Sequence, residues 1–113
     1  MKNSTTKTVT LASALLVATL VSAMAGDAKE IWGKSCAKCH GEDGKGQTKM
    51  GQKLSVKDFT DAKVQADLKD DAALKAIKEG VKDKEGKTLM KAAEGVTDDD
   101  AKALVQLVRG FKK

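Results

Sequence analysis

Residues 35–46 read SCAKCHGEDGKG and contain both cysteines and the only histidine of the chain, Cys36, Cys39 and His40. The spacing Cys-x-x-Cys-His is compatible with three kinds of chemistry: zinc ligation, thiol–disulfide exchange and covalent attachment of a haem. Each of these needs different residues elsewhere in the sequence. The rest of the chain therefore decides which chemistry the motif serves.

Zinc ligation and thiol chemistry both lack residues that they need. A structural zinc site usually takes four ligands from two pairs of Cys or His. This chain offers three donors within one pentapeptide, and only a carboxylate could complete the set. A thiol oxidoreductase places Cys-x-x-Cys at the start of a helix that follows a strand. Here the pair ends a predicted helix in a chain without a βαβ pattern, so the sequence favours haem attachment over both alternatives.

Covalent haem attachment accounts for the whole motif. Two cysteines three residues apart lie on one side of a helical turn, so both can form thioether bonds to the vinyl groups of one porphyrin. His40 then projects under the ring, where its neutral imidazole can bind iron. The group would also enlarge the core of a small chain that has only three aromatic residues. We predict one covalent haem c on Cys36 and Cys39, with His40 as the proximal iron ligand.

A methionine is the best candidate for the opposite iron ligand. Met1 and Met24 fall in the apolar N-terminal segment, and Met50 is only ten residues past His40, too close to cross to the other face of the ring. Met90 comes fifty residues after His40, in a lysine-rich segment ahead of the last predicted helix. Its thioether would give His/Met ligation, which raises the reduction potential. The alternative role of an isolated Met is to fill the core.

The first residues have the features of a secretory signal peptide. Lys2 and Lys7 precede an apolar run over residues 9–21, and the small residues Ala23 and Ala25 then form a cleavage site. We predict a cleaved signal peptide over residues 1–25, a mature domain over residues 26–113, and a periplasmic location. The alternative is an uncleaved membrane anchor, which the Ser and Thr residues inside the run disfavour.

The composition of the mature chain predicts helices joined by glycine-rich loops, because proline is absent and Ala, Lys and Glu are abundant. The excess of charge is moderate, with 19 basic against 16 acidic side chains after the signal peptide. No basic run with interleaved aromatic residues is present, so we expect no nucleic-acid partner.

Three helices are predicted. The first starts near Asp27, and its apolar stripe through Ile31 and Trp32 continues into the two cysteines, which places the motif against the core. Residues 41–51 contain four glycines and are expected to form a loop.

The other two predicted helices follow this loop. A middle helix follows Asp70, with Leu74, Ile77 and Val81 on one face and Gly80 as its stop. The last helix follows Thr97 as N-cap, and its apolar residues recur at helical spacing. They are Ala101, Leu104, Val105, Val108 and Phe111. The residues between the last two helices are expected to be irregular.

The mature chain resembles a class I c-type cytochrome of the small monohaem bacterial type. The matching stretches are GDAKEIWGKSCAKCHGEDGKG over residues 26–46, MGQKLSVKDF over residues 50–59, and AIKEGVKDKEGKTLMKAAEGVTDDDAKALVQLVRGF over residues 76–111. The resemblance implies an all-α cytochrome c fold, with three to five short helices packed around one covalently attached haem and with the N- and C-terminal helices crossing. Two positions depart from the family pattern. Gln52 replaces the usual Pro whose carbonyl accepts the Nδ1 proton of the His ligand, and Lys91 replaces the Pro that usually follows the Met ligand.

The predicted function is electron transfer in the periplasm by a monomeric carrier, not an enzyme, that has no small-molecule substrate and exchanges electrons with redox partner proteins. Two alternatives stay open: a haem enzyme or gas or redox sensor with an open sixth iron site, and a haem-bearing subunit of a respiratory complex. Six lysines around the motif and the Met90 segment are predicted either to steer an acidic partner or only to solvate the surface. They are Lys34, Lys38, Lys45, Lys49, Lys87 and Lys91.

Overall fold

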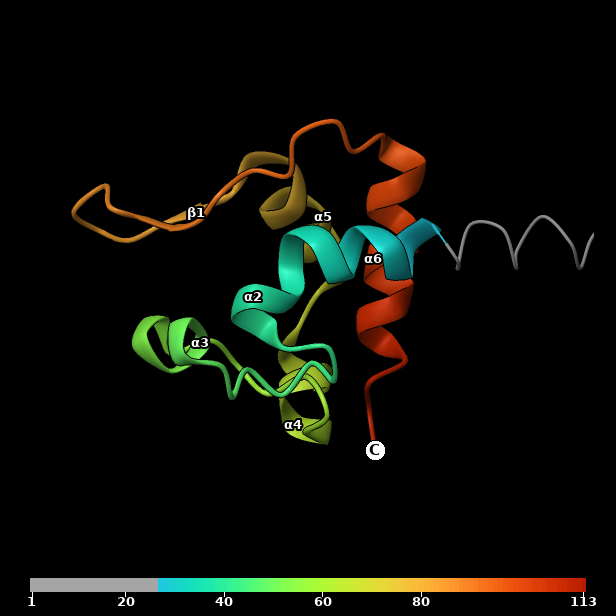
Figure 1. Ribbon diagram of the computed structural model, residues 1–113, viewed down its shortest axis with the longest axis horizontal. Helices are drawn as coiled ribbons and strands as arrows, with labels where there is room; N and C mark the ends of the chain where they lie inside the picture. The colour runs from blue at the N-terminus through green and yellow to red at the C-terminus, as the bar shows by residue number, and fades with distance from the viewer. Residues whose placement is uncertain (1–26) are drawn as a thin grey trace, which may run out of the picture.

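The computed structural model describes residues 27–113, so the predicted signal peptide lies outside the described residues. A helical run begins at residue 27, changes to a π-helix at η1 (Trp32–Cys36) and ends with α2 (Ala37–His40). Next come α3 (Lys49–Leu54), α4 (Ala62–Asp67), α5 (Asp70–Glu79), the short strands β1 (Val81–Lys82) and β2 (Thr88–Met90), and α6 (Asp98–Arg109) (Figure 1). The prediction of a mainly helical domain of short helices is confirmed. Within residues 27–113, none of the helices has both the length and the apolar character needed to cross a membrane.

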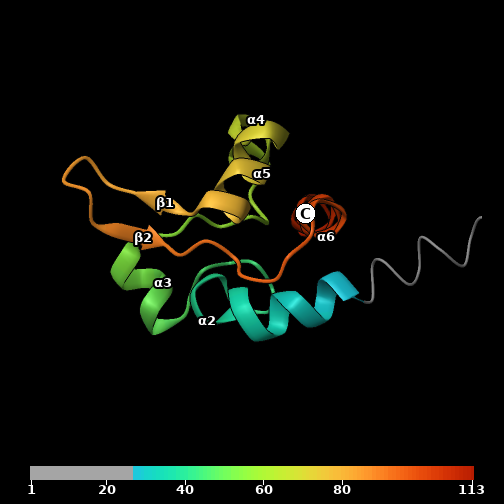
Figure 2. The same ribbon diagram turned by 90° about the horizontal axis from the view of Figure 1, so that it is seen from above.

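The first helical run and α6 cross and pack against each other, as predicted (Figures 1 and 2). Trp32 from the first run lies in one buried cluster with Leu104 and Val108 from α6. Ala73 and Ile77 of α5 complete this core, so three helices share it. Burial of these side chains is the main stabilising term for so small a domain.

Helix α6 is fixed at its N-terminus by the sequence TDDD. The Thr97 hydroxyl accepts a hydrogen bond from the backbone N–H of Asp100, and the Asp100 carboxylate accepts one from the N–H of Thr97. This reciprocal pair satisfies two N–H groups that lack helical partners. The aspartates of the first turn also lie at the positive end of the helix dipole. The predicted N-cap is confirmed.

Helix α5 ends at Gly80, as predicted, but Val81 does not continue its buried face. Gly80 adopts a φ of 78°, and a Cβ at this position would lie 2.5 Å from the carbonyl oxygen of Met90. The chain therefore turns there, and Val81 enters β1 with its side chain exposed. Our expectation of an irregular segment was wrong, because β1 and β2 pair as an antiparallel hairpin with Val81 opposite Met90. The Asp83 carboxylate closes the turn by accepting backbone N–H groups from Glu85 and Lys87.

The glycine-rich segment after His40 is a loop up to Thr48, and α3 then begins inside the predicted loop. The Thr48 hydroxyl caps α3 by accepting the N–H of Gly51, and it donates to the carbonyl of Cys39 at 2.8 Å. One side chain therefore starts α3 and joins it to the end of α2. This tertiary bond explains why a helix forms where glycine content predicted none.

Candidate functional site

The two cysteines lie at the junction of η1 and α2. The N–H of Ala37 bonds to the carbonyl of Trp32, five residues earlier, which is the π-helical pattern. Both thiols are free and half-buried, and Cys36 packs against the core. Burial, followed by the nearby Cys39 thiol, raises the pKa of the Cys36 thiol. A redox-active thiol has a lowered pKa, so this environment argues against thiol exchange.

The His40 imidazole is flanked by two aromatic rings. Its centroid lies 5.2 Å from that of Phe59 with an interplanar angle of 23°, and 5.5 Å from that of Trp32 with an angle of 36°. Burial lowers the pKa of His40, which keeps the imidazole neutral and able to bind a metal. Its Nδ1 atom is buried without a hydrogen-bond partner.

The loop after His40 folds back over the motif. The N–H of Gly46 donates to the His40 carbonyl at 2.7 Å, and the Trp32 indole N–H donates to the Gly41 carbonyl at 2.9 Å. Gly51 of α3 approaches so closely that a Cβ there would lie 2.3 Å from the Cys39 carbonyl oxygen. These contacts join α2, the loop after His40 and α3 to one another, so the residues of the motif are held on this side by both the loop and α3.

Met90 reaches the core from the hairpin. Its side chain is half-buried and packs against the buried cluster, and its backbone is held beside Gly80. Just after it, the N–H of Ala93 donates to the carbonyl of Ile77 in α5 at 2.9 Å. Cys36, Cys39 and His40 thus lie in one helical segment. Met90 comes from the separate strand β2, and the chain just after it is anchored to α5.

Three large apolar side chains are exposed among residues 27–113. Met50 on α3, Val81 on β1 and Leu89 on β2 are 39%, 37% and 36% exposed. Their elements lie at the end of the molecule away from α6 in both views (Figures 1 and 2).

Other kinds of site find less support. No group of three or more His, Cys, Asp or Glu side chains in residues 27–113 is arranged to hold a metal ion. A surface hollow of about 460 Å³ lies between α5 and α6, where charged side chains such as Lys78 and Asp98 line it. None of the four predicted site residues lines that hollow.

The cytochrome c family model matches residues 25–112. The chain belongs to the cytochrome c family. Its fold is similar to the solved structure named KustC0563 c-type cytochrome, with a TM-score of 0.65 and 36% sequence identity, over 76% of this chain and 98% of that one. The solved structure of a Kustc0563 point mutant is similar too, with a TM-score of 0.63 and 36% identity over 76% of this chain and 99% of the mutant chain. No curated protein matches the sequence.

Membership of this family means that the cytochrome carries covalently bound haem c and transfers electrons. The residues of the motif fit such a group. The free thiols of Cys36 and Cys39 precede the neutral imidazole of His40 in one helical segment. The thioether side chain of Met90 packs against the same core. Partners of cytochromes c are redox proteins, in agreement with the predicted kind of partner.

The departure at Gln52 has a structural outcome. In the family pattern the backbone carbonyl at the position of Gln52 accepts the Nδ1 proton of the His ligand. Instead, this carbonyl accepts the N–H of Ser55 at 3.3 Å, and His40 Nδ1 has no partner. The Gln52 side chain turns toward the Gln47 carbonyl, also at 3.3 Å. The hydrogen bond to Nδ1 that the family pattern provides at this position is therefore absent.

The sequence did not reveal the importance of Phe59 and Gln65. Phe59 was noted only as one of three aromatic residues, yet its ring stacks on His40. Gln65 is 5% exposed and bonds to the backbone carbonyls of the nearby Phe59 and of the distant Val108. No local pattern marks either role, because both depend on contacts between elements far apart in the chain.

Proposed function

We propose that this cytochrome is a monomeric periplasmic electron carrier with one haem c, attached through Cys36 and Cys39 and ligated by His40 and Met90. The observation that supports it best is the free thiol pair followed directly by a half-buried, neutral imidazole. Met90 is supported by its place at the core edge and by the anchoring of the chain on both sides of it.

The protein's own contribution is to hold the ligands still and keep water away. The haem supplies the one-electron ferrous/ferric couple when bound. Cys36 and Cys39 would hold the haem to η1 and α2 through thioether bonds, and the packing of Trp32 against α6 holds that segment to the core. With the His40 imidazole and the Met90 thioether both bound to iron, no ligand position would remain for a substrate, and the haem would only gain and lose an electron.

The ligand assignment is tested by the visible spectrum of the purified ferric holoprotein. We expect the weak long-wavelength band of Met bound to ferric iron in the wild type and in Met50→Ala, which serves as the matched control. Met90→Ala should lose this band and keep its covalent haem. A wild type without the band that binds carbon monoxide when reduced would refute the His/Met assignment and support an enzyme or sensor with an open site.

The attachment residues are tested by the spectrum of the denatured reduced haem in pyridine, which reports how many vinyl groups carry thioether bonds. Cys36→Ser and Cys39→Ser should each leave one unsaturated vinyl group and shift the absorption to longer wavelength. Ser35→Ala, next to the motif, should not. An unchanged spectrum in either Cys variant would contradict its assignment.

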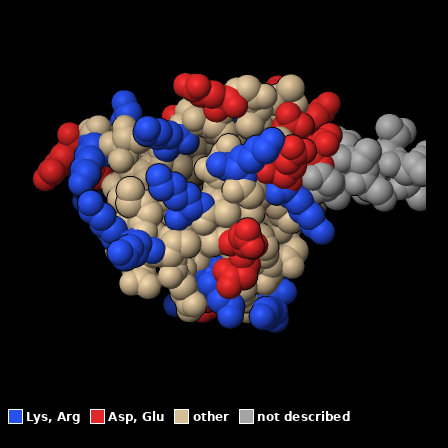
Figure 3. All heavy atoms as spheres, in the orientation of Figure 1, with Lys and Arg blue, Asp and Glu red and all other residues tan. Residues whose placement is uncertain are grey.

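Docking is proposed to use exposed lysines at the hairpin and α3. Basic side chains gather on this side of the visible face (Figure 3). The exposed lysines of these elements and their flanks are Lys49, Lys53, Lys82, Lys84, Lys87 and Lys91. Of the six lysines predicted from the sequence, Lys34 is neutralised by an ion pair with Glu30 at 2.8 Å and Lys45 is half-buried.

A positive surface steers an acidic partner through long-range attraction that salt screens. We expect Lys87→Gln to slow electron transfer with an acidic redox protein at low salt, and Lys102→Gln on α6 to leave the rate unchanged. Equal rates at low and high salt would contradict steering.

The intact mass of the isolated protein tests export, because a chain that starts at Gly26 supports cleavage and a chain that keeps residues 1–25 supports an anchor.

A further inference from the structure

The orientation of the His40 ring is not fixed by a hydrogen bond at Nδ1. An iron-bound histidine usually donates this N–H to a carbonyl or carboxylate, which sets the ring's tautomer and angle. Here the ring instead contacts the rings of Phe59 and Trp32. We propose that Phe59 is the positioning residue for the His40 imidazole, and that Gln65 and Arg109 hold Phe59 in place. The proposal rests on the assignment of His40 as an iron ligand.

Phe59 has the more parallel contact of the two rings. Its interplanar angle with His40 is 23°, against 36° for Trp32. Rotation of a stacked ring about its own bonds is opposed along the whole face of its neighbour. Phe59 can therefore restrict the imidazole angle, provided that Phe59 itself does not move.

The backbone of Phe59 is held at both of its polar groups. Its N–H donates to the Gly44 carbonyl at 2.8 Å, and its carbonyl accepts the Gln65 side-chain amide at 2.6 Å. Phe59 lies between α3 and α4, so no helix or strand fixes it. The two bonds tie it to the loop after His40 on one side and to α4 on the other.

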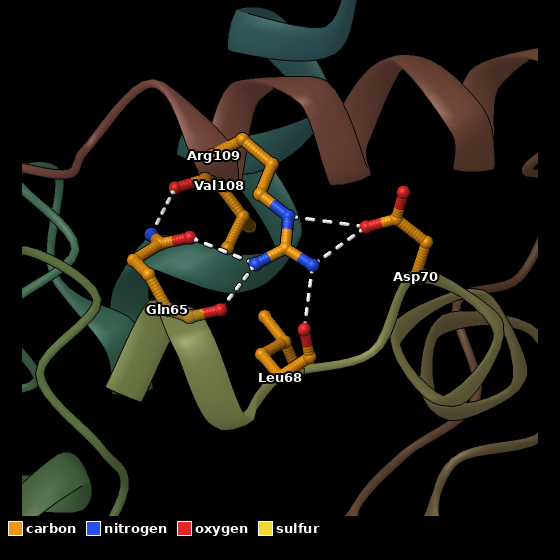
Figure 4. A network of polar contacts seen from close by, with 5 residues as sticks. All are labelled: Gln65, Leu68, Asp70, Val108 and Arg109. Carbon is orange, nitrogen blue, oxygen red and sulfur yellow. Dashed lines mark hydrogen bonds and ion pairs between the residues drawn. The ribbon is translucent and has the colours of Figure 1, made fainter. Parts of the chain in front are cut away.

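Gln65 is in turn fixed from the C-terminal helix (Figure 4). Its amide nitrogen also donates to the Val108 carbonyl at 2.7 Å, and its side-chain oxygen accepts from Arg109 at 3.1 Å. The guanidinium of Arg109 further donates to the Gln65 and Leu68 carbonyls and to the Asp70 carboxylate. Because Gln65 is buried, these bonds are shielded from water and define one side-chain orientation.

This chain of contacts connects the end of α6 to the face of the iron ligand. A change at Arg109 is expected to reach His40 through Gln65 and Phe59, with no contact between Arg109 and the motif. Lysine keeps the charge at position 109 but not the forked geometry that binds four acceptor atoms on three residues. Arg109→Lys therefore tests the connection without removing the charge.

The experiment uses ferric holoprotein and measures the NMR shifts of the haem methyl groups, which depend on the angle of the axial imidazole, together with the midpoint potential. Phe59→Leu should change the spread of the methyl shifts and lower the potential, because the ligand becomes more open to water. Arg109→Lys should change the methyl shifts in the same direction by a smaller amount. Thr97→Ala weakens the opposite end of α6 and should lower the melting temperature alone.

Methyl shifts and potential that stay at wild-type values in a folded Phe59→Leu protein would overturn the proposal. Should Phe59→Leu not fold, unchanged methyl shifts in Arg109→Lys would overturn the connection to α6. Failure of the assignment of His40 as an iron ligand would be seen in the wild type alone. The His40 ring protons of the wild type would then lack large paramagnetic shifts, and this result does not depend on the Phe59 and Arg109 variants.

Discussion

Gly51→Ala is expected to destabilise the protein even though it replaces glycine inside a helix. The added Cβ would lie 2.3 Å from the Cys39 carbonyl oxygen and 2.4 Å from that of Gly46, both well below the 3.0 Å that real Cβ contacts respect. Both atoms belong to the backbone, so no side-chain rotation relieves the overlap. The helix would have to move away from the loop and α2.

The magnitude follows from two opposing terms. Alanine gains about 1 kcal/mol over glycine in a helix, and overpacking a closely packed site costs about 1–3 kcal/mol or more. With two backbone clashes we take the upper part of that range and expect a net loss of about 2 kcal/mol in the free energy of unfolding. For a domain of this size the melting temperature should fall by roughly 8–16 °C.

Gly33→Ala is the matched control. Gly33 also lies in a helical segment and is exposed, and a Cβ there would meet nothing within 4 Å. Only the gain in helix propensity remains, so we expect a stabilisation of about 0.5–1 kcal/mol. Thermal unfolding of the holoproteins, followed by far-UV circular dichroism, measures the stability change caused by Gly51→Ala and the change caused by Gly33→Ala. If Gly51→Ala melts at or above the wild-type temperature, the close approach of α3 to the motif does not exist as described.

Further predictions concern α6 and its contacts. Thr97→Ala removes the N-cap and should cost about 1 kcal/mol in urea unfolding, with unchanged stability arguing against the capping box. Leu104→Ala, at a side chain 1% exposed, should cost about 2–5 kcal/mol, whereas the exposed Gln106→Ala should be near neutral. The Lys78 ammonium holds the pKa of Asp98 below its ordinary value of 3.8, so this pair stabilises the fold above that pH and loses its effect as the pH falls through the lower folded pKa. The melting temperatures of wild type and Lys78→Met should accordingly converge in acid, and a constant gap would contradict the pairing.

The parts of the fold that depend on local sequence were predictable. Thr97 and Gly80 mark a helix start and a helix end through backbone chemistry that acts within a few residues. The crossing of the terminal helices followed from the resemblance and agrees with the two apolar stripes. The motif identified the cofactor because few other donors exist in the chain.

The remaining features depend on contacts between distant segments. The π-helical turn at Trp32–Cys36 holds more residues than an α-turn, so helical spacing alone could not give the depth of each cysteine. The hairpin is closed by the Asp83 carboxylate, and α3 is joined to α2 by Thr48. The missing partner of His40 Nδ1 could be suspected at Gln52 but required the structure to establish.

The core joins the two ends of the described chain, and this sets an order of events during synthesis. Trp32 and Leu104 share one buried cluster although more than seventy residues separate them. Since a chain is made from its N-terminus, the partners that cover the first helical run are the last to appear. The side of the first helical run that carries Trp32 thus stays uncovered until α6 is complete.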